Sequence, residues 1–147
     1  MSNTLMAGKR GLIMGLANDK SIAWGIAKAC ADAGAELAFS YQGEALKKRV
    51  EPLAAQIGAD LLVECDVANQ DSLDALFATL KDKWGTIDFV VHAIGFSDKN
   101  ELRGRYVDTS PENFKMTMDI SVFAFTAVAR RAADLMPNGG ALLTLTY

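Results

Sequence analysis

A short apolar run ends at a glycine and is followed six residues later by the start of a helical pattern. The run is Gly-Leu-Ile-Met at 11–14, the glycine is Gly15, and the pattern extends from Ser21 to Gly34. A buried strand, a glycine turn and a helix N-terminus form the phosphate-binding corner of a dinucleotide fold, where backbone N–H groups face an anion. The spacing here is one glycine, five residues and a serine rather than G-x-G-x-x-G. This departure narrows the families that fit.

Strand and helix patterns alternate along the rest of the chain. Several apolar segments are continuous rather than alternating, which is typical of strands buried on both faces of a parallel sheet. The expected strands are 9–14, 36–40, 60–64, 87–92 and 141–146. The expected helices are 22–34, 46–57, 73–84 and 110 to about 136. The order predicts a Rossmann-like, doubly wound parallel sheet in three α/β/α layers, with residues 1–147 forming one domain.

Individual residues refine the prediction at two helices and one loop. Pro52 lies within the second helical stripe and is expected to kink or split that helix. Ser110 and Pro111 form a good helix start, with a capping hydroxyl followed by proline at the first helical position. The polar segment 97–105 lacks periodicity, so we expect a loop beyond the fourth strand, on the side where ligands bind in this architecture.

Composition argues against several classes of function. The net charge is −3 with mixed signs, so we expect neither a nucleic-acid partner nor a polybasic membrane surface. No apolar run approaches the roughly 18 residues that span a bilayer. Cys30 and Cys65 have no metal-binding spacing and are expected to be reduced thiols of a cytoplasmic protein, and no metal is expected. His92, the single histidine, is expected to be a packed strand residue rather than a catalyst.

The ends of the second and third strands offer contacts for the adenosine half of a dinucleotide. The second strand runs into Gln42 with neither an acid nor an arginine, which favours NADH over NADPH, although a solvated turn glutamine fits equally. Asp66 could accept from an adenine amino group while Val67 packs on the ring. The alternative for Asp66 is a cap for the helix that begins near Asn69.

The fourth and fifth strands end in residues suited to the nicotinamide half. Gly95 would let the backbone approach the second ribose, and Tyr147 would face the nicotinamide region. An ordinary aromatic residue on a buried strand is the alternative for Tyr147.

Together these motifs form an ordered set that covers nearly the whole chain. They are Gly15-x5-Ser21-Ile22-Ala23 and the segments 36–42, 65–67, 92–96, 119–121 and 141–147. The chain resembles the bacterial NADH-dependent enoyl-acyl-carrier-protein reductases of type I, in the short-chain dehydrogenase/reductase superfamily. The resemblance implies cofactor contacts from Gly15, Ser21, Ile22, Gln42, Asp66, Val67, Ile94, Gly95 and Ile120. It also implies a substrate contact at Ser97 and a catalytic role for Tyr147, which matches the first of two active-site tyrosines.

The resemblance implies reduction of the trans-2 double bond of an acyl thioester in the last step of fatty-acid elongation. The partner would be an acidic acyl-carrier protein, with Lys99, Arg103 and Arg105 as docking candidates, and the assembly a homotetramer. The family's second tyrosine and its lysine fall beyond Tyr147, so we expect a chain truncated after the fifth strand that lacks part of the catalytic site. A carbonyl (3-ketoacyl) reductase and a non-catalytic nucleotide-binding fragment are the alternatives.

Overall fold

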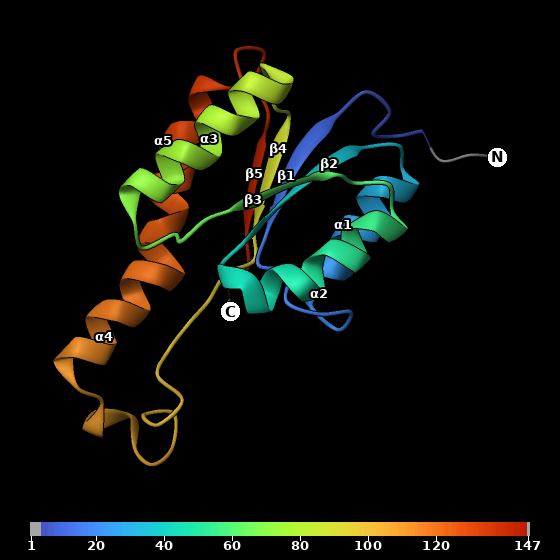
Figure 1. Cartoon of the computed structure of the whole chain (residues 1–147). Coiled ribbons are helices and arrows are strands. Elements are labelled where there is room, and N and C mark those ends of the chain that lie inside the picture. Colours follow the sequence, from blue (N-terminus) through green and yellow to red (C-terminus); the bar gives the residue numbers. More distant parts are fainter. Residues whose placement is uncertain (1–3, 147) are drawn as a thin grey trace.

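The computed structural model describes residues 4–146, which form one parallel sheet flanked by helices (Figure 1). The strand order is β3-β2-β1-β4-β5. The strands are β1 (Arg10–Met14), β2 (Glu36–Tyr41), β3 (Leu61–Glu64), β4 (Phe89–His92) and β5 (Ala141–Thr144). The predicted doubly wound α/β/α fold is therefore confirmed. The strand order reverses between β1 and β4, and ligands of such sheets bind at the carboxyl ends of the strands beside this switch point.

Two layers of helices cover the sheet, one on each face (Figure 1). One layer holds α1 (Ile22–Asp32) and α2 (Gly43–Gln56), and the other holds α3 (Gln70–Trp84) and α5 (Ala124–Asp134). The short 3-10 helix η1 (Tyr106–Asp108), then α4 (Pro111–Met118) and the π-helical segment η2 (Asp119–Phe123), lead into α5. Figure 1 shows α4 extending beyond the sheet with the loop from β4 beside it.

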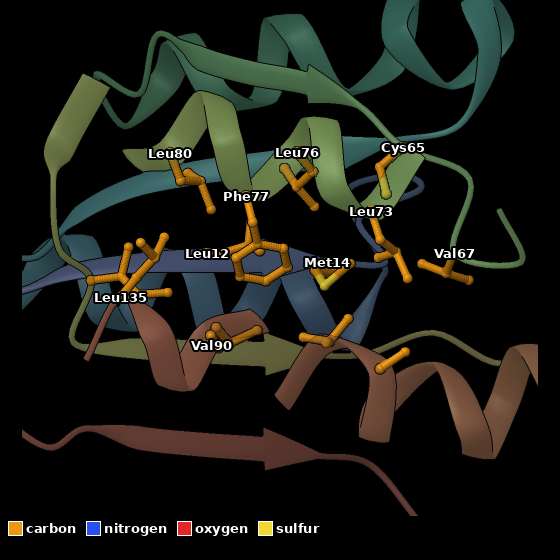
Figure 2. Packing of buried hydrophobic residues seen from close by; sticks show 14 of the residues in the cluster. Leu12, Met14, Cys65, Val67, Leu73, Leu76, Phe77, Leu80, Val90 and Leu135 are labelled. Carbon is orange, nitrogen blue, oxygen red and sulfur yellow. The ribbon is translucent and has the colours of Figure 1, made fainter. Parts of the chain in front are cut away.

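The continuous apolar run of β1 reflects burial on both faces of the sheet. Leu12 and Met14 belong to the core cluster beneath α3 and α5, whereas Ile13 belongs to the cluster beneath α1 and α2. All three side chains are fully buried. Figure 2 shows the first cluster, in which side chains of α3 such as Leu76 point toward β1. Alternation of side chains along a strand thus fills two cores with apolar residues.

Of the two expectations for Pro52, a kink or a split of its helix, the structure rules out the split. The α2 helix runs unbroken from Gly43 to Gln56 with Pro52 inside it. Val50 and Ala54, on either side of the proline, are fully buried against the sheet layer, so packing holds both halves of the helix in place. Tertiary packing here outweighs the hydrogen bond that proline cannot donate.

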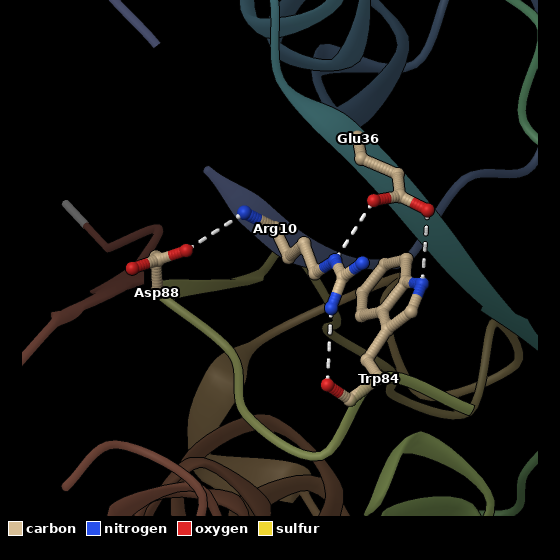
Figure 3. Close-up of polar contacts among 4 residues, drawn as sticks. All are labelled: Arg10, Glu36, Trp84 and Asp88. Atoms are coloured by element: carbon tan, nitrogen blue, oxygen red, sulfur yellow. Dashed lines mark hydrogen bonds and ion pairs between the residues drawn. The ribbon is translucent and has the colours of Figure 1, made fainter. Parts of the chain in front are cut away.

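A polar cluster closes the end of the sheet opposite to the strand carboxyl ends (Figure 3). Arg10 donates from Nε to Glu36 at 2.8 Å and from Nη1 to the carbonyl of Trp84 at 3.0 Å. Its backbone N–H donates to the carboxylate of Asp88 at 2.9 Å, and the Trp84 indole donates to Glu36 at 3.1 Å. These contacts join β1, β2 and the end of α3 away from the site described next.

Candidate functional site

A cavity of about 400 Å³ opens at the carboxyl ends of β1 to β4, beside the switch point. Its lining comes from the end of β2, from the loops that follow the four strands, from Leu46 of α2 and from Ile120 of η2. It brings together seven of the residues predicted to bind a cofactor: Gly15, Gln42, Asp66, Val67, Ile94, Gly95 and Ile120. Residues from five parts of the sequence therefore meet in one concave site.

Gly15 lets the first loop pass against the end of β4. Its φ is +96°, and a Cβ built on it would lie 2.0 Å from the carbonyl oxygen of Ala93. The N–H of Ala93 donates to the carbonyl of Met14 at 3.0 Å, which holds the two segments together. Both the backbone conformation and the absence of space require glycine at this position. The glycine thus sets the width of the cavity between β1 and β4.

Ser21 and Ile22 do not line the cavity. The Ser21 hydroxyl accepts hydrogen bonds from the N–H groups of Ala17 at 3.1 Å and Asn18 at 3.0 Å, so it shapes the glycine loop. The Ile22 side chain is 67% exposed. No side-chain hydrogen bond caps α1 at Ser21, so N–H groups of its first turn are left for another acceptor. The predicted phosphate contacts of these two residues stay a prediction.

Asp66 lines the cavity and does not cap α3. Its N–H donates to the Ser72 hydroxyl at 2.9 Å, and its Oδ1 accepts from the N–H of Ala68 at 3.0 Å. The cap of α3 is Asn69, whose side chain accepts from the N–H of Ser72 at 3.1 Å. The alternative of Asp66 as the helix cap is therefore wrong. Asp66 lines the cavity with Val67 as its neighbour.

Gln42 stands at the start of α2 but makes no capping hydrogen bond with its side chain. Gln42 is exposed and lines the cavity beside Tyr41 at the end of β2. Its predicted contact with the adenosine half stays a prediction.

Sequence reasoning missed Cys65 as part of the cavity lining. Burial raises the pKa of its thiol to about 11, with a hydrogen bond from Ser72 opposing the shift and Asp66 adding to it. The thiol is therefore protonated at neutral pH and acts as a small apolar wall rather than a nucleophile. Its position directly before Asp66 at a strand end was the available signal. Cys65 and Cys30 are both free, as expected.

The other half of the cavity is formed by the loop after β4 and by the π-helical segment. Ile94, Gly95 and Phe96 line it together with Ile120. Ser97 lies in a separate, neighbouring hollow of about 460 Å³, and its hydroxyl accepts a hydrogen bond from Thr117 at 3.0 Å. Its predicted substrate contact stays a prediction. Tyr147 lies outside the described residues.

His92 is fully buried in β4, as the sequence predicted. The Thr144 hydroxyl lies 3.3 Å from its Nδ1 and donates to its carbonyl oxygen at 3.3 Å. Among residues 4–146, Nε2 has no hydrogen-bond partner. Burial lowers the pKa of His92, so the ring is neutral and packs 5.6 Å from Phe125.

His92 should make the fold acid-sensitive. Because burial lowers its pKa, the folded state takes up a proton less readily than the unfolded state, whose histidine titrates near about 6.5. The contribution of His92 is complete above that pH and is lost as the pH falls through 6.5 toward the lower folded-state pKa. Urea unfolding between about pH 7.5 and about pH 5.5 should show a smaller loss of unfolding free energy in His92→Asn. Equal losses in both proteins would contradict this assignment.

Two further observations concern the described part of the chain. Across residues 4–146, no three His, Cys, Asp or Glu side chains come together in a way that could hold a metal ion. No helix in this range is both long and apolar enough to cross a bilayer.

The chain matches a family of known proteins. Residues 15–147 match the family model described as "Enoyl-(Acyl carrier protein) reductase". The "Enoyl-[acyl-carrier-protein] reductase [NADH] 1" of Rhizobium meliloti (strain 1021) is 65% identical over 143 residues, which cover 97% of this chain and 53% of the relative. The second such reductase of that strain is 64% identical and covers 99% of this chain and 54% of the relative. The chain spans about half the length of the curated relatives it matches.

Solved structures give the same result. The crystal structure of FabI from Candidatus Liberibacter asiaticus has a TM-score of 0.96 at 59% identity and covers 97% of this chain and 55% of that one. The Anaplasma phagocytophilum reductase, solved in complex with NAD, has a TM-score of 0.94 at 57% identity with the same coverage. The Bacillus cereus reductase, solved with NADP+, has a TM-score of 0.94 at 46% identity, covering 97% of this chain and 56% of that one. The chain belongs to the enoyl-(acyl carrier protein) reductase family.

Proposed function

We propose that the full-length protein reduces the trans-2 double bond of enoyl-acyl-carrier-protein thioesters with NADH. The cavity at the β1/β4 switch point carries this proposal, because it gathers the predicted cofactor contacts around the close approach of Gly15 to Ala93. Relatives at 64–65% identity are named as NADH-dependent reductases of this kind. The proposed enzyme is cytoplasmic.

The residues present fit a dinucleotide. The uncapped first turn of α1 suits a pyrophosphate, Gln42 and Asp66 suit the adenosine half, and the Ile94–Phe96 loop with Ile120 suits the nicotinamide half. When bound, the nicotinamide supplies a hydride to the β-carbon of the thioester. The chain's part is to orient both reactants and to exclude water. A hydroxyl aimed at the thioester oxygen stabilises the charge that develops there. Tyr147 is the catalytic residue that we propose for this chain, as the match to the first of the family's two active-site tyrosines.

Turnover of two thioesters tests the proposal. The purified full-length protein should oxidise NADH with crotonyl thioester much faster than with acetoacetyl thioester. Faster turnover of the ketone would indicate a carbonyl reductase and overturn the proposal. Absence of turnover with tight NADH binding would indicate a nucleotide-binding protein instead.

Asp66 should contribute to cofactor affinity. Asp66→Ala removes a carboxylate in the cavity lining, so we expect the Kd for NADH to rise about tenfold or more, as for one hydrogen bond to a charged group. Asn69→Ala is the matched control, because it removes the cap of α3 three residues away. It should lower the free energy of unfolding by about 1 kcal/mol and leave the Kd unchanged. NADH fluorescence titration and urea unfolding measure the two effects, and an unchanged Kd in Asp66→Ala would contradict the adenine contact.

The choice of NADH over NADPH rests on Gln42. No arginine stands at the end of β2 to pair with a 2′-phosphate, and the amide of Gln42 suits ribose hydroxyls. Parallel titrations with the two cofactors test this choice, and tighter binding of NADPH would overturn it.

The proposed homotetramer uses the exposed apolar side of the α4–η2 region. Phe114, Met118, Val122 and Phe123 expose between 42% and 53% of their surface there. Mass measurement of the full-length protein tests the assembly. For the acidic carrier protein, the docking candidates are Lys99, Arg103 and Arg105, of which Arg105 also pairs with Asp108 at 2.9 Å.

A further inference from the structure

Three polar side chains on one helix face hold the loop after β4. Asn113, Thr117 and Ser121 follow one another at intervals of four residues, so they lie along one side of the helix. Asn113 accepts from the N–H of Asp98 at 2.9 Å, and Thr117 donates to Ser97 at 3.0 Å. Ser121 bonds to the residue before these two. We call these three residues the polar ladder. It hydrogen-bonds three consecutive loop residues to the helix. The loop and the helix run in opposite directions along these contacts.

The last step of the polar ladder lies directly behind the cavity wall. The Ser121 hydroxyl accepts from the N–H of Phe96 at 3.0 Å and donates to the carbonyl of Phe96 at 3.2 Å. A Cβ built on Gly95 would lie 3.9 Å from the same oxygen. Gly95 and Phe96 both line the cavity, whereas Ser121 does not. The Ser121 hydroxyl thus bonds to both the N–H and the carbonyl of Phe96, although Ser121 itself is not part of the cavity lining.

In the π-helical segment, two neighbouring side chains have different roles. The N–H of Ala124 bonds to the carbonyl of Asp119, five residues back, so the helix is widened by one residue at this turn. Ile120 lines the cavity, and the adjacent Ser121 bonds to the loop. No proline or glycine lies within Asp119–Phe123 to explain the irregular turn. Such π-bulges inside α-helices are frequent at functional sites.

We propose that Ser121 is a positioning residue that fixes the Ile94–Phe96 wall against η2 and so sets the shape of the nicotinamide half of the cavity. The proposal rests on the function proposed above. Ser121 is not among the residues that line the cavity, and it acts through the backbone of Phe96. Its loss frees the wall without altering the lining side chains, so affinity suffers more than the chemical step.

The test compares Ser121→Ala with the wild-type full-length protein. We expect the Kd for NADH and the KM for crotonyl thioester to rise about threefold to tenfold, the range for loss of one or two neutral hydrogen bonds. The kcat should change less than the KM, and Ser121→Thr, which retains the hydroxyl, should restore both constants. Thr79→Ala is the control, because it removes a helix hydroxyl that donates to the carbonyl of Ala75 on α3, away from the cavity.

Circular dichroism and thermal unfolding establish that each variant is folded. Should Ser121→Ala not fold, Ser121→Cys, which keeps the size and weakens the hydrogen bonds, carries the same prediction. Wild-type Kd and KM values in the folded variant, with normal turnover by the parent, would overturn the positioning role alone. Absence of enoyl thioester reduction by the parent would overturn the proposed function instead. Equal changes in Thr79→Ala would also overturn the role of Ser121, since they would reflect general stability.

Discussion

Replacing Gly15 with alanine in the full-length protein is expected to abolish NADH binding and to destabilise the fold strongly. Gly15 has a φ of +96°, and the added Cβ would stand 2.0 Å from the carbonyl oxygen of Ala93, a backbone atom that β4 holds in place. Backbone strain of about 1–2 kcal/mol and overpacking of about 1–3 kcal/mol together predict a loss of about 2–5 kcal/mol. Because relief requires the β1 and β4 loops to separate, the cavity between them must change shape. Thermal unfolding with and without NADH measures both effects.

Two other glycines separate the causes of this loss. Gly58 has a φ of +70° with nothing within 4 Å of an added Cβ, so Gly58→Ala tests the backbone strain alone, at about 1–2 kcal/mol. Gly25 lies inside α1 with equally open space, and Gly25→Ala should stabilise the protein by about 0.5–1 kcal/mol. Neither control should change the Kd for NADH. A Gly15→Ala protein that binds NADH as tightly as the wild type would contradict the close approach that defines the site.

The sequence predicted the sheet well because burial on both faces leaves a strong pattern. The run ending at Met14 is apolar at every position, since its residues alternate between two cores. The bounds were less accurate. The fourth strand was expected from Ile87, but the N–H of Ile87 bonds to the carbonyl of Leu135 instead of a strand, so β4 begins at Phe89. The first residue of this strand depends on a contact with the distant end of α5, and the sequence around Ile87 carries no sign of that contact.

The candidate site was predictable wherever it lies at a strand end. Gly15, Asp66 and Gly95 each follow a strand directly, and parallel strands bring such residues to one edge of the sheet. The roles of Ser21 and the π-helical segment were not predictable in the same way. The Ser21 hydroxyl bonds within its own loop, and the π turn lies in an unbroken helical pattern. Both features follow from side-chain contacts that form only after the loops have taken their final paths.

Replacing Leu76 with alanine is expected to destabilise the full-length protein by about 2–5 kcal/mol, as for other fully buried leucines. Leu76 lies on α3, is 0% exposed, and points toward Met14 on β1 in the core cluster of Figure 2. The truncated side chain leaves a void that the sheet and helix cannot fully close. Leu102→Ala is the matched control, because Leu102 is 70% exposed and its loss should change the unfolding free energy by less than about 0.5 kcal/mol.

The response of Leu76→Ala to NADH separates it from Gly15→Ala. Leu76 does not line the cavity, so the variant should keep its affinity and gain the same stabilisation from NADH as the wild type. At a free concentration of about 100 times the Kd, that gain is about 2.7 kcal/mol. Gly15→Ala should gain nearly nothing under the same conditions, although its stability loss is of similar size. A loss of NADH stabilisation in Leu76→Ala would mean that packing under α3, rather than the approach of β1 to β4, sets the shape of the cavity.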